Sequence, residues 1–284
     1  MVNTLILLAI MVFITVQQIT KKAYNQKNTS GTMSFSAASC VAALAVFLVT
    51  ADGKLEFSTA YLGHSVLFAL SYSTTIITGM LALAVGPLSL TCLISSFSLI
   101  IPTIYGILVL NEPVSTTLLV GLGLLVVALI LINLEEKGQK KITMKWILLM
   151  VFCFFGNGAC STVQKMQQIH FQGQYKSEFM IAALIISTVA IGIFALCTEK
   201  KQVLPNLKAG FWLYLICGVA NGLTNFLVVF LSLRVAASVM FPVISAGGIV
   251  LAFLLSLLVY KEKLSKWQII GSALGLVSVI FLNM

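Results

Sequence analysis

Residues 235–284 have the sequence VAASVMFPVISAGGIVLAFLLSLLVYKEKLSKWQIIGSALGLVSVIFLNM, and residues 85–134 carry the same pattern. Each copy is an apolar run, a short turn with one glutamate, and a second apolar run. A shift of 150 positions pairs Glu112 with Glu262, and it also pairs a serine, a glycine and an asparagine of each copy. Two apolar runs joined by a short polar turn predict a helical hairpin, so the chain encodes one hairpin twice.

The similarity extends upstream of the hairpins. At the same shift, the polar residues of segment 71–75 fall opposite those of segment 221–225. A slightly shorter shift aligns the polar end of the first apolar segment with that of the sixth. Self-similarity over the whole chain indicates a duplicated fold. We therefore predict two homologous units, residues 1–134 and 142–284.

The composition is that of an integral membrane protein. Hydrophobic residues make up 60% of the chain and charged residues only 9%, whereas about a quarter of the residues in a soluble domain are charged. A helix needs about 20 largely apolar residues to cross the bilayer. We therefore predict an all-α integral membrane protein with ten transmembrane helices. They are expected near residues 2–20, 33–50, 59–82, 87–110, 115–134, 144–168, 178–198, 209–232, 236–260 and 266–284.

The basic residues predict the orientation of these helices. If ten helices alternate in direction, only Lys54, Lys165, Lys176 and Arg234 of the 17 basic residues fall on one side. Basic residues gather on the cytoplasmic side, so both termini are predicted to lie outside. Each unit has five helices, an odd number. The second unit therefore enters the membrane from the opposite face, and the units form an inverted repeat.

All three tryptophans begin an apolar segment beside lysines. Trp146, Trp212 and Trp267 are therefore expected to lie at headgroup depth as interfacial anchors. The formal charge of +9 would favour nucleic acid in a soluble protein. Here the basic residues lie between membrane segments, so no nucleic-acid partner is predicted.

No motif for catalysis or for a cofactor is present in the sequence. The six cysteines lie inside apolar segments without metal-ligand spacing. The sequence lacks a P-loop, a zinc-binding histidine pair and a G-x-S-x-G motif. We therefore expect neither an enzyme nor a bound metal or cofactor.

Polar side chains recur at helical spacing inside the apolar segments. Amides and lysine are costly there unless they face protein or water, so we predict that they line a solvated central cavity that binds a substrate. For the serines and threonines the alternative is hydrogen bonding between neighbouring helices. The predicted substrate-binding residues are Gln17, Gln18, Ser71, Tyr72, Thr75, Ser95, Asn157, Gln164, Lys165, Asn221, Thr224, Asn225 and Ser245.

Four charged side chains bear on the choice of substrate. Glu112 and Glu262 suggest proton coupling, but each lies in a turn at a helix end, where a carboxylate can cap or pair with the N-terminus of the next helix at little cost. We expect this structural role for both. Lys165 and Arg234 favour a carboxylate-bearing or zwitterionic solute, unless both extend along their helices to the headgroups.

The duplicated hairpin resembles the EamA-type members of the drug/metabolite transporter superfamily. The resemblance covers the whole chain, and the paired residues Glu112, Ser115 and Gly121, and Glu262, Ser265 and Gly271, carry it. It implies two inverted five-helix repeats, with helices one to four and six to nine around a central cavity. It also implies alternating-access transport of small metabolites, often amino acids, across a bacterial inner membrane. The first turn, Asn111-Glu112-Pro113, departs from the usual Gly-Glu pair.

The sequence therefore predicts a multi-pass cell-membrane protein that is a secondary transporter for a small organic solute. An amino acid or another carboxylate-bearing or zwitterionic solute is favoured, with amino acid export as one form. The alternatives are a non-transporting scaffold or partner subunit and a flippase for lipid-linked metabolites with the same fold. Its expected partners are the small-molecule substrate and the lipid bilayer, and the sequence leaves open whether it also forms a homodimer.

Overall fold

The computed structural model describes residues 2–27, 31–51, 55–56, 58–85, 91, 94–95, 97–133, 143–258 and 265–283. The described residues form helices and no strands, which confirms the predicted all-α fold. The elements are α1 (Val2–Lys27), α2 (Thr32–Thr50), α3 (Leu62–Val85), α5 (Ile100–Leu108), α6 (Thr116–Asn133), α7 (Met144–His170), α8 (Lys176–Glu199), the 3-10 helix η1 (Lys200–Gln202), α9 (Val203–Ala209), α10 (Phe211–Leu231), α11 (Ala237–Leu258) and α12 (Lys266–Asn283).

Several of these helices are long and apolar enough to cross a membrane. Within the described residues there are six such segments, Val2–Lys21, Thr32–Thr50, Leu62–Ala82, Met144–His170, Lys176–Ala209 and Phe211–Leu231. Shorter apolar helices cover Thr116–Ala128, Ala237–Gly247 and Ile269–Leu282. The protein is therefore a multi-pass membrane protein, as the composition predicts.

Two predicted segments differ in detail from the structure. The fourth, at 87–110, is represented chiefly by α5, because much of its first half lies outside the described residues. Between the segments predicted at 178–198 and 209–232, the structure has the short helix α9 where the sequence predicts a loop. Seven residues are too few to show an apolar period. Pro205 lies in the first turn of α9, where a helix does not need its N–H.

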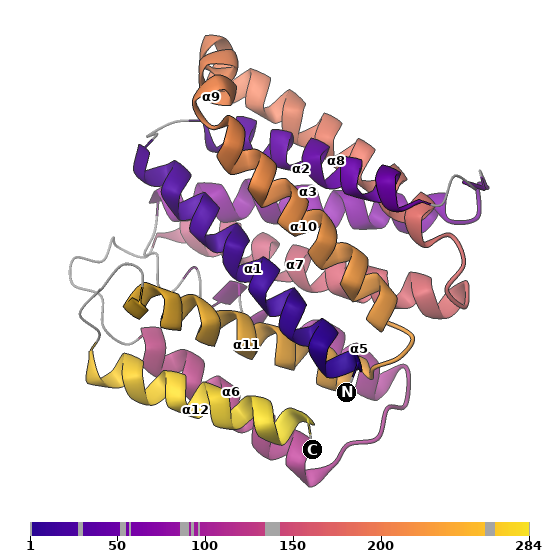
Figure 1. Ribbon diagram of the computed structural model, residues 1–284, viewed down its shortest axis with the longest axis vertical. Coiled ribbons are helices and arrows are strands. Elements are labelled where there is room, and N and C mark those ends of the chain that lie inside the picture. Colours follow the sequence, from indigo (N-terminus) through magenta and orange to yellow (C-terminus); the bar gives the residue numbers. More distant parts are fainter. Residues whose placement is uncertain are drawn as a thin grey trace.

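The helices pack in pairs that join the two halves of the sequence (Figure 1). Helices α1 and α2 both lie against α10, α2 also packs along α8, α3 packs along α7, and α6 packs along α12. In the last pair, Ser278 Oγ donates to the Gly121 carbonyl at 2.9 Å. The two predicted units are thus interleaved and do not form separate bodies.

Both chain termini lie at the same end of the molecule, on the right of Figure 1. At the opposite end, α1 and α8 finish while α7 and α12 begin. The described basic residues at or near that end are Lys21, Lys22, Lys27, Lys145, Lys200, Lys201, Lys208 and Lys266. The other described basic residues are Lys165, Lys176 and Arg234.

Two of the three tryptophans are exposed, which interfacial anchoring requires. Trp212 and Trp267 are 70% and 47% exposed, as interfacial anchors would be. Trp146 is buried, and its Nε1 donates to Thr91 Oγ1 at 3.0 Å. The anchor role is therefore wrong for Trp146. A neighbouring lysine gives the depth of a residue in the membrane but not the helix face on which it lies.

Candidate functional site

A chain of side-chain hydrogen bonds joins α3, α10 and α7. Asn221 Nδ2 on α10 donates to the Tyr72 hydroxyl on α3 at 2.8 Å. One turn further along α10, Asn225 Nδ2 donates to the carbonyl and the Oδ1 of Asn221, both at 2.9 Å. Asn225 Oδ1 accepts from Gln164 Nε2 on α7 at 2.8 Å. The structure therefore brings together four of the predicted site residues, and we call them the amide chain.

A fourth helix joins beside the amide chain. Gln17 Nε2 on α1 donates to Thr224 Oγ1 at 3.0 Å, and Thr224 directly precedes Asn225 on α10. Tyr72 and Asn221 lie near the middle of α3 and α10. For a helix that spans the membrane, its middle is furthest from both membrane surfaces, and unpaired polar groups are most costly there.

A second polar cluster lies on the same face of α7. Asn157 Nδ2 donates to the Ser95 carbonyl at 3.2 Å and to Ser98 Oγ at 2.6 Å. Ser95 Oγ lies 3.6 Å from Cys153 Sγ. Asn157 and Gln164 are seven residues apart, so they share one face of α7 and are separated by about 10 Å along it.

Ser71 and Thr75 occupy the contact between α3 and α7. Thr75 Oγ1 donates to the Ser71 carbonyl at 2.8 Å. On α7, a Cβ atom at Gly156 would lie 2.6 Å from Thr75 Oγ1 and 3.0 Å from the Ser71 carbonyl. Glycine at 156 therefore lets the two helices approach closely. The observed contacts of Ser71 and Thr75 are those of helix packing, which is the alternative expected for serines and threonines.

The ammonium group of Lys165 is enclosed by protein atoms. The residue is 4% exposed, and Nζ donates to the carbonyls of Ser232 at 2.6 Å and Val235 at 2.7 Å. Both carbonyls belong to the connection between α10 and α11. Lys165 Nζ also lies 3.8 Å from Glu112 Oε1. Lys165 thus does not extend to the headgroups, and in this conformation its charge is compensated by the protein.

The Glu112 carboxylate caps a helix, but the expectation that this is the next helix, α6, is wrong. It accepts from the backbone N–H groups of Ala237 at 2.7 Å and Ser238 at 2.8 Å. These groups begin α11, so the capped helix is distant in sequence and is not the one that follows the turn. The carboxylate of Glu112 therefore binds both a helix N-terminus and Lys165, and we call this group the Glu112 clasp. Glu262 lies outside the described residues.

Three side chains considered for the cavity lie apart from these groups. Gln18 is exposed, and its side-chain amide makes no hydrogen bond to the described residues. Ser245 on α11 is buried and lines a cavity of about 60 Å³ together with Phe97 and Pro242. Arg234 is exposed, with its guanidinium 4.0 Å from the Phe230 ring centroid. It therefore does not make the interior positive.

Sequence reasoning missed two features of this region. Pro242 lies inside α11 and has no N–H for the carbonyl four residues before it. The proline is visible in the sequence inside the predicted helix 236–260, and it is the signal from which this missing hydrogen bond could have been predicted. Glu199, at the end of α8, accepts from the Met33 and Ser34 N–H groups that begin α2. The sequence gives no sign of that pairing, because the partners are far apart along the chain.

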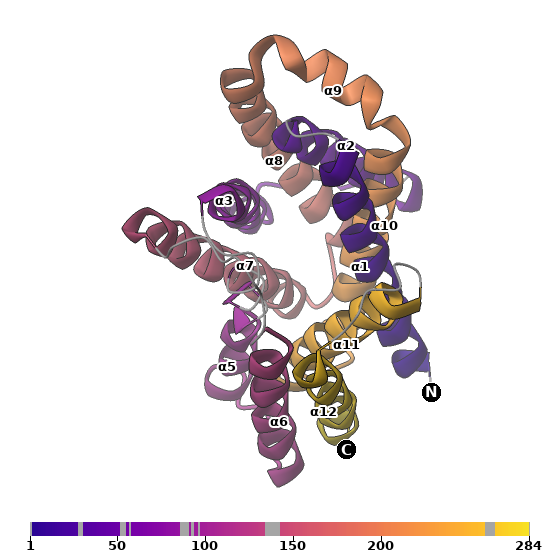
Figure 2. The ribbon, with the colours of Figure 1, turned by 90° about the vertical axis from the view of Figure 1, so that its left-hand side faces the viewer.

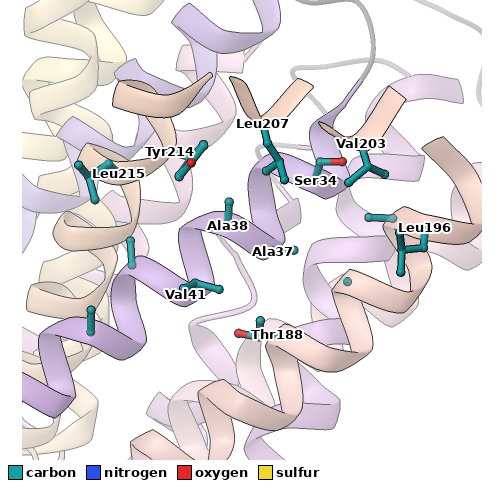
Figure 3. Close-up of a pocket in the computed structure, with 14 residues that line it drawn as sticks. Ser34, Ala37, Ala38, Val41, Thr188, Leu196, Val203, Leu207, Tyr214 and Leu215 are labelled. Atoms are coloured by element: carbon teal, nitrogen blue, oxygen red, sulfur yellow. The ribbon is translucent and has the colours of Figure 1, made fainter. Parts of the chain in front are cut away.

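A larger cavity lies away from all the predicted site residues. Its volume is about 560 Å³, and it is formed by α2, α8, α9 and α10 (Figure 3). Its lining is mostly alanine, leucine and valine.

Comparison with known proteins identifies the family. The EamA-like transporter family matches residues 141–284, which is just over half of the chain. No curated protein matches. Among 28 matching chains of solved structures, one described only as a crystal structure of a protein has a TM-score of 0.76. The match covers 98% of this chain and 95% of that chain at 13% identity, so it establishes the fold alone. The family match covers more than half of the chain, and the apolar helices agree with it. The chain therefore belongs to the EamA-like transporter family, part of the drug/metabolite transporter superfamily.

Proposed function

We propose that the protein is a secondary transporter that moves a small organic metabolite across the membrane by alternating access. The amide chain carries this proposal. It joins helices from both halves of the sequence near mid-membrane, where transporters built from repeats hold their substrates. Its amides offer both donors and acceptors. A zwitterionic solute such as an amino acid fits this combination best, because its ammonium and carboxylate need acceptors and donors respectively.

The state of Lys165 refines the proposal. A carboxylate-bearing substrate would compete with Glu112 for the Lys165 ammonium, because one protein carboxylate already lies 3.8 Å away. The initial binding of the substrate is therefore assigned to the amide chain, and Lys165 contributes when the Glu112 clasp opens.

The proposal includes the architecture that the duplication predicts. It comprises ten membrane helices in two inverted repeats, residues 1–134 and 142–284, with the basic end of the molecule in the cytoplasm of a bacterial cell and both termini outside. The pairing of helices from both halves supports it, because inverted repeats meet around a shared central site.

Substitution of Asn225 by Leu tests the proposed site. Leucine is tolerated in a membrane helix but removes both the donor and the acceptor of Asn225. A metabolite panel first selects the substrate by thermal stabilisation of the purified protein. Transport of that substrate into proteoliposomes is then expected to fall to background for Asn225→Leu. Expression and monodispersity should stay near those of the wild type.

Asn3→Leu provides the matched control, because it makes the same change on α1 outside the predicted site, and it should transport normally. Wild-type transport by Asn225→Leu would contradict the proposed site. A second variant, Lys165→Gln, should lower the affinity for an anionic or zwitterionic substrate about ten- to a hundredfold, because a hydrogen bond to a charged group contributes about 1.5–3 kcal/mol. The affinity for a neutral substrate of similar size should fall less.

A further inference from the structure

The 560 Å³ cavity is a groove on the side of the helix bundle. Figure 3 shows Ala37, Ala38 and Val41 of α2 on one side, Thr188 and Leu196 of α8 on the other, and Leu207 of α9 near one end. Val41 is 53% exposed and Leu196 is 61% exposed, so the rim faces outward from the bundle. In a membrane protein, an outward apolar face borders the lipid.

The dimensions of the groove match one leaflet of a bilayer. Its lining on α2 runs from Ser34 to Ala45, which is about 16 Å at 1.5 Å per residue. Half of the hydrocarbon thickness of a bilayer is about 15 Å. The volume also lies in the range of about 300–1,000 Å³ that is typical of ligand pockets. The groove therefore has room for an acyl chain that extends from the headgroups toward the bilayer centre.

Two aromatic side chains fix which end of the groove lies at the membrane surface. Phe211 and Trp212 begin α10 directly after α9, and they are 48% and 70% exposed. An exposed tryptophan at a helix end favours headgroup depth. Figure 2 shows α9 spanning the space between the ends of α8 and α10. The α9 end is therefore the mouth of the groove at the membrane surface.

The mouth is positively charged. Lys200 and Lys201 in η1 and Lys208 in α9 belong to the same short segment as the lining residues Val203 and Leu207, and all three are exposed. None of them forms an ion pair with the described part of the chain. The nearby Glu199 carboxylate is already used by backbone N–H groups at the start of α2. Basic residues near the surface attract anionic lipids, by about fivefold in affinity for each lysine.

We propose that the groove binds one acyl chain of an anionic phospholipid, with its phosphate near Lys200, Lys201 and Lys208. The apolar lining and the length of the groove select the chain, and the three lysines select the headgroup. Zwitterionic phospholipids with the same chains fill the groove less tightly. This inference is independent of the proposed transport function, since it rests only on a membrane location.

A glycine in the groove permits a direct test. Gly192 lines the groove, and a Cβ atom added there would meet nothing within 4 Å, so Gly192→Leu fills the groove without a clash. Gly123 on α6 is equally open but lies outside the groove, which makes Gly123→Leu the matched control. A third variant replaces Lys200, Lys201 and Lys208 with Gln. The full-length proteins are incubated with phosphatidylglycerol or phosphatidylcholine of identical acyl chains, and bound lipid is counted by native mass spectrometry.

The wild type and Gly123→Leu are expected to retain one phosphatidylglycerol more tightly than phosphatidylcholine. Gly192→Leu should lose that molecule. The lysine variant should bind phosphatidylglycerol about a hundredfold more weakly and no better than phosphatidylcholine. Equal retention of phosphatidylglycerol by the wild type and Gly192→Leu would overturn the assignment of the groove. Equal retention of both lipids by the wild type would overturn the proposed preference for an anionic headgroup. Loss of a dimer, and not of lipid, in Gly192→Leu would assign the groove to a second copy of the chain.

Discussion

Replacement of Glu112 by Gln should destabilise the protein by about 3 kcal/mol. The carboxylate accepts two short hydrogen bonds from the start of α11 and lies 3.8 Å from Lys165 Nζ. Glutamine has only one acceptor oxygen, so at least one of these bonds is lost, and a bond to a charged group contributes about 1.5–3 kcal/mol. The change also leaves Lys165 buried without a counter-charge. Breaking a buried pair in this way costs about 3–5 kcal/mol. The Glu112 side chain is 11% exposed, which favours the lower end of that range.

The thermal midpoint Tm of the purified protein measures this effect. At about 2 °C per kcal/mol, Glu112→Gln should lower Tm by roughly 6 °C. Lys165→Met should also lower Tm, because two carbonyls lose their donor. The double variant should be more stable than the sum of the two losses predicts, since each single variant leaves one charge of the pair unmatched. Glu178→Gln is the matched control. The structure shows its carboxylate accepting from the Glu56 N–H at an exposed position, so a shift below about 2 °C is expected.

Additive losses in the double variant would show that Glu112 and Lys165 are not coupled. A Glu112→Gln protein with unchanged Tm but altered pH dependence of transport would refute the capping role. It would instead favour the alternative that Glu112 couples transport to protons.

Three further predictions concern other parts of the molecule. Burial is the larger cause and the charge of Glu199 the smaller one that together raise the pKa of Tyr24 to about 12. The neutral phenol therefore stabilises the folded state below the ordinary tyrosine pKa of about 10. This stabilisation is lost as the pH rises from about 10 to about 12. The fall in Tm over that range should accordingly be smaller for Tyr24→Phe than for the wild type. Gly156→Ala places a Cβ 2.6 Å from Thr75 Oγ1 and should destabilise by about 1–3 kcal/mol, whereas Gly123→Ala, with open space around it, should leave Tm nearly unchanged. A reporter active only in the cytoplasm should be active after Lys140 and silent after Met284, and the reverse pattern would contradict the proposed orientation.

Hydropathy and the duplication predict much of the fold. The apolar segments appear as helices where the structure describes them, because about 20 apolar residues have few alternatives to a helix in lipid. Hydropathy does not predict the short helix α9, because α9 lies at the end of a membrane segment and has no apolar stretch of its own. Hydropathy also does not predict the burial of Trp146. That burial depends on which helices pack against α7, and hydropathy gives no information about helix neighbours.

The candidate site is predictable to a similar degree. Polar residues on matching helices predict that Gln164, Asn221 and Asn225 find polar partners, because amides in lipid must be satisfied, and the structure shows these partners. Which partner each one finds depends on packing. The same pattern groups Lys165 with the substrate-binding residues, yet it contacts carbonyls of the connection between α10 and α11 and the carboxylate of Glu112. No local pattern connects Glu112 with a helix that begins 125 residues later.

The two capping carboxylates constrain how the proposed transporter can move. Glu112, in the first half of the sequence, binds the start of α11 in the second half. Glu199, in the second half, binds the start of α2 in the first half, at the opposite end of the molecule. Each contact is a charged cap on buried or half-buried backbone, so opening either end by breaking it would cost several kcal/mol. The free-energy cost of opening is smaller if α2 moves together with α8, and if α11 moves together with the turn that holds Glu112. Neither cap involves α3 or α10, the helices that carry Tyr72, Asn221 and Asn225. We therefore expect the hydrogen bonds of the amide chain to change between the two access states while both caps persist.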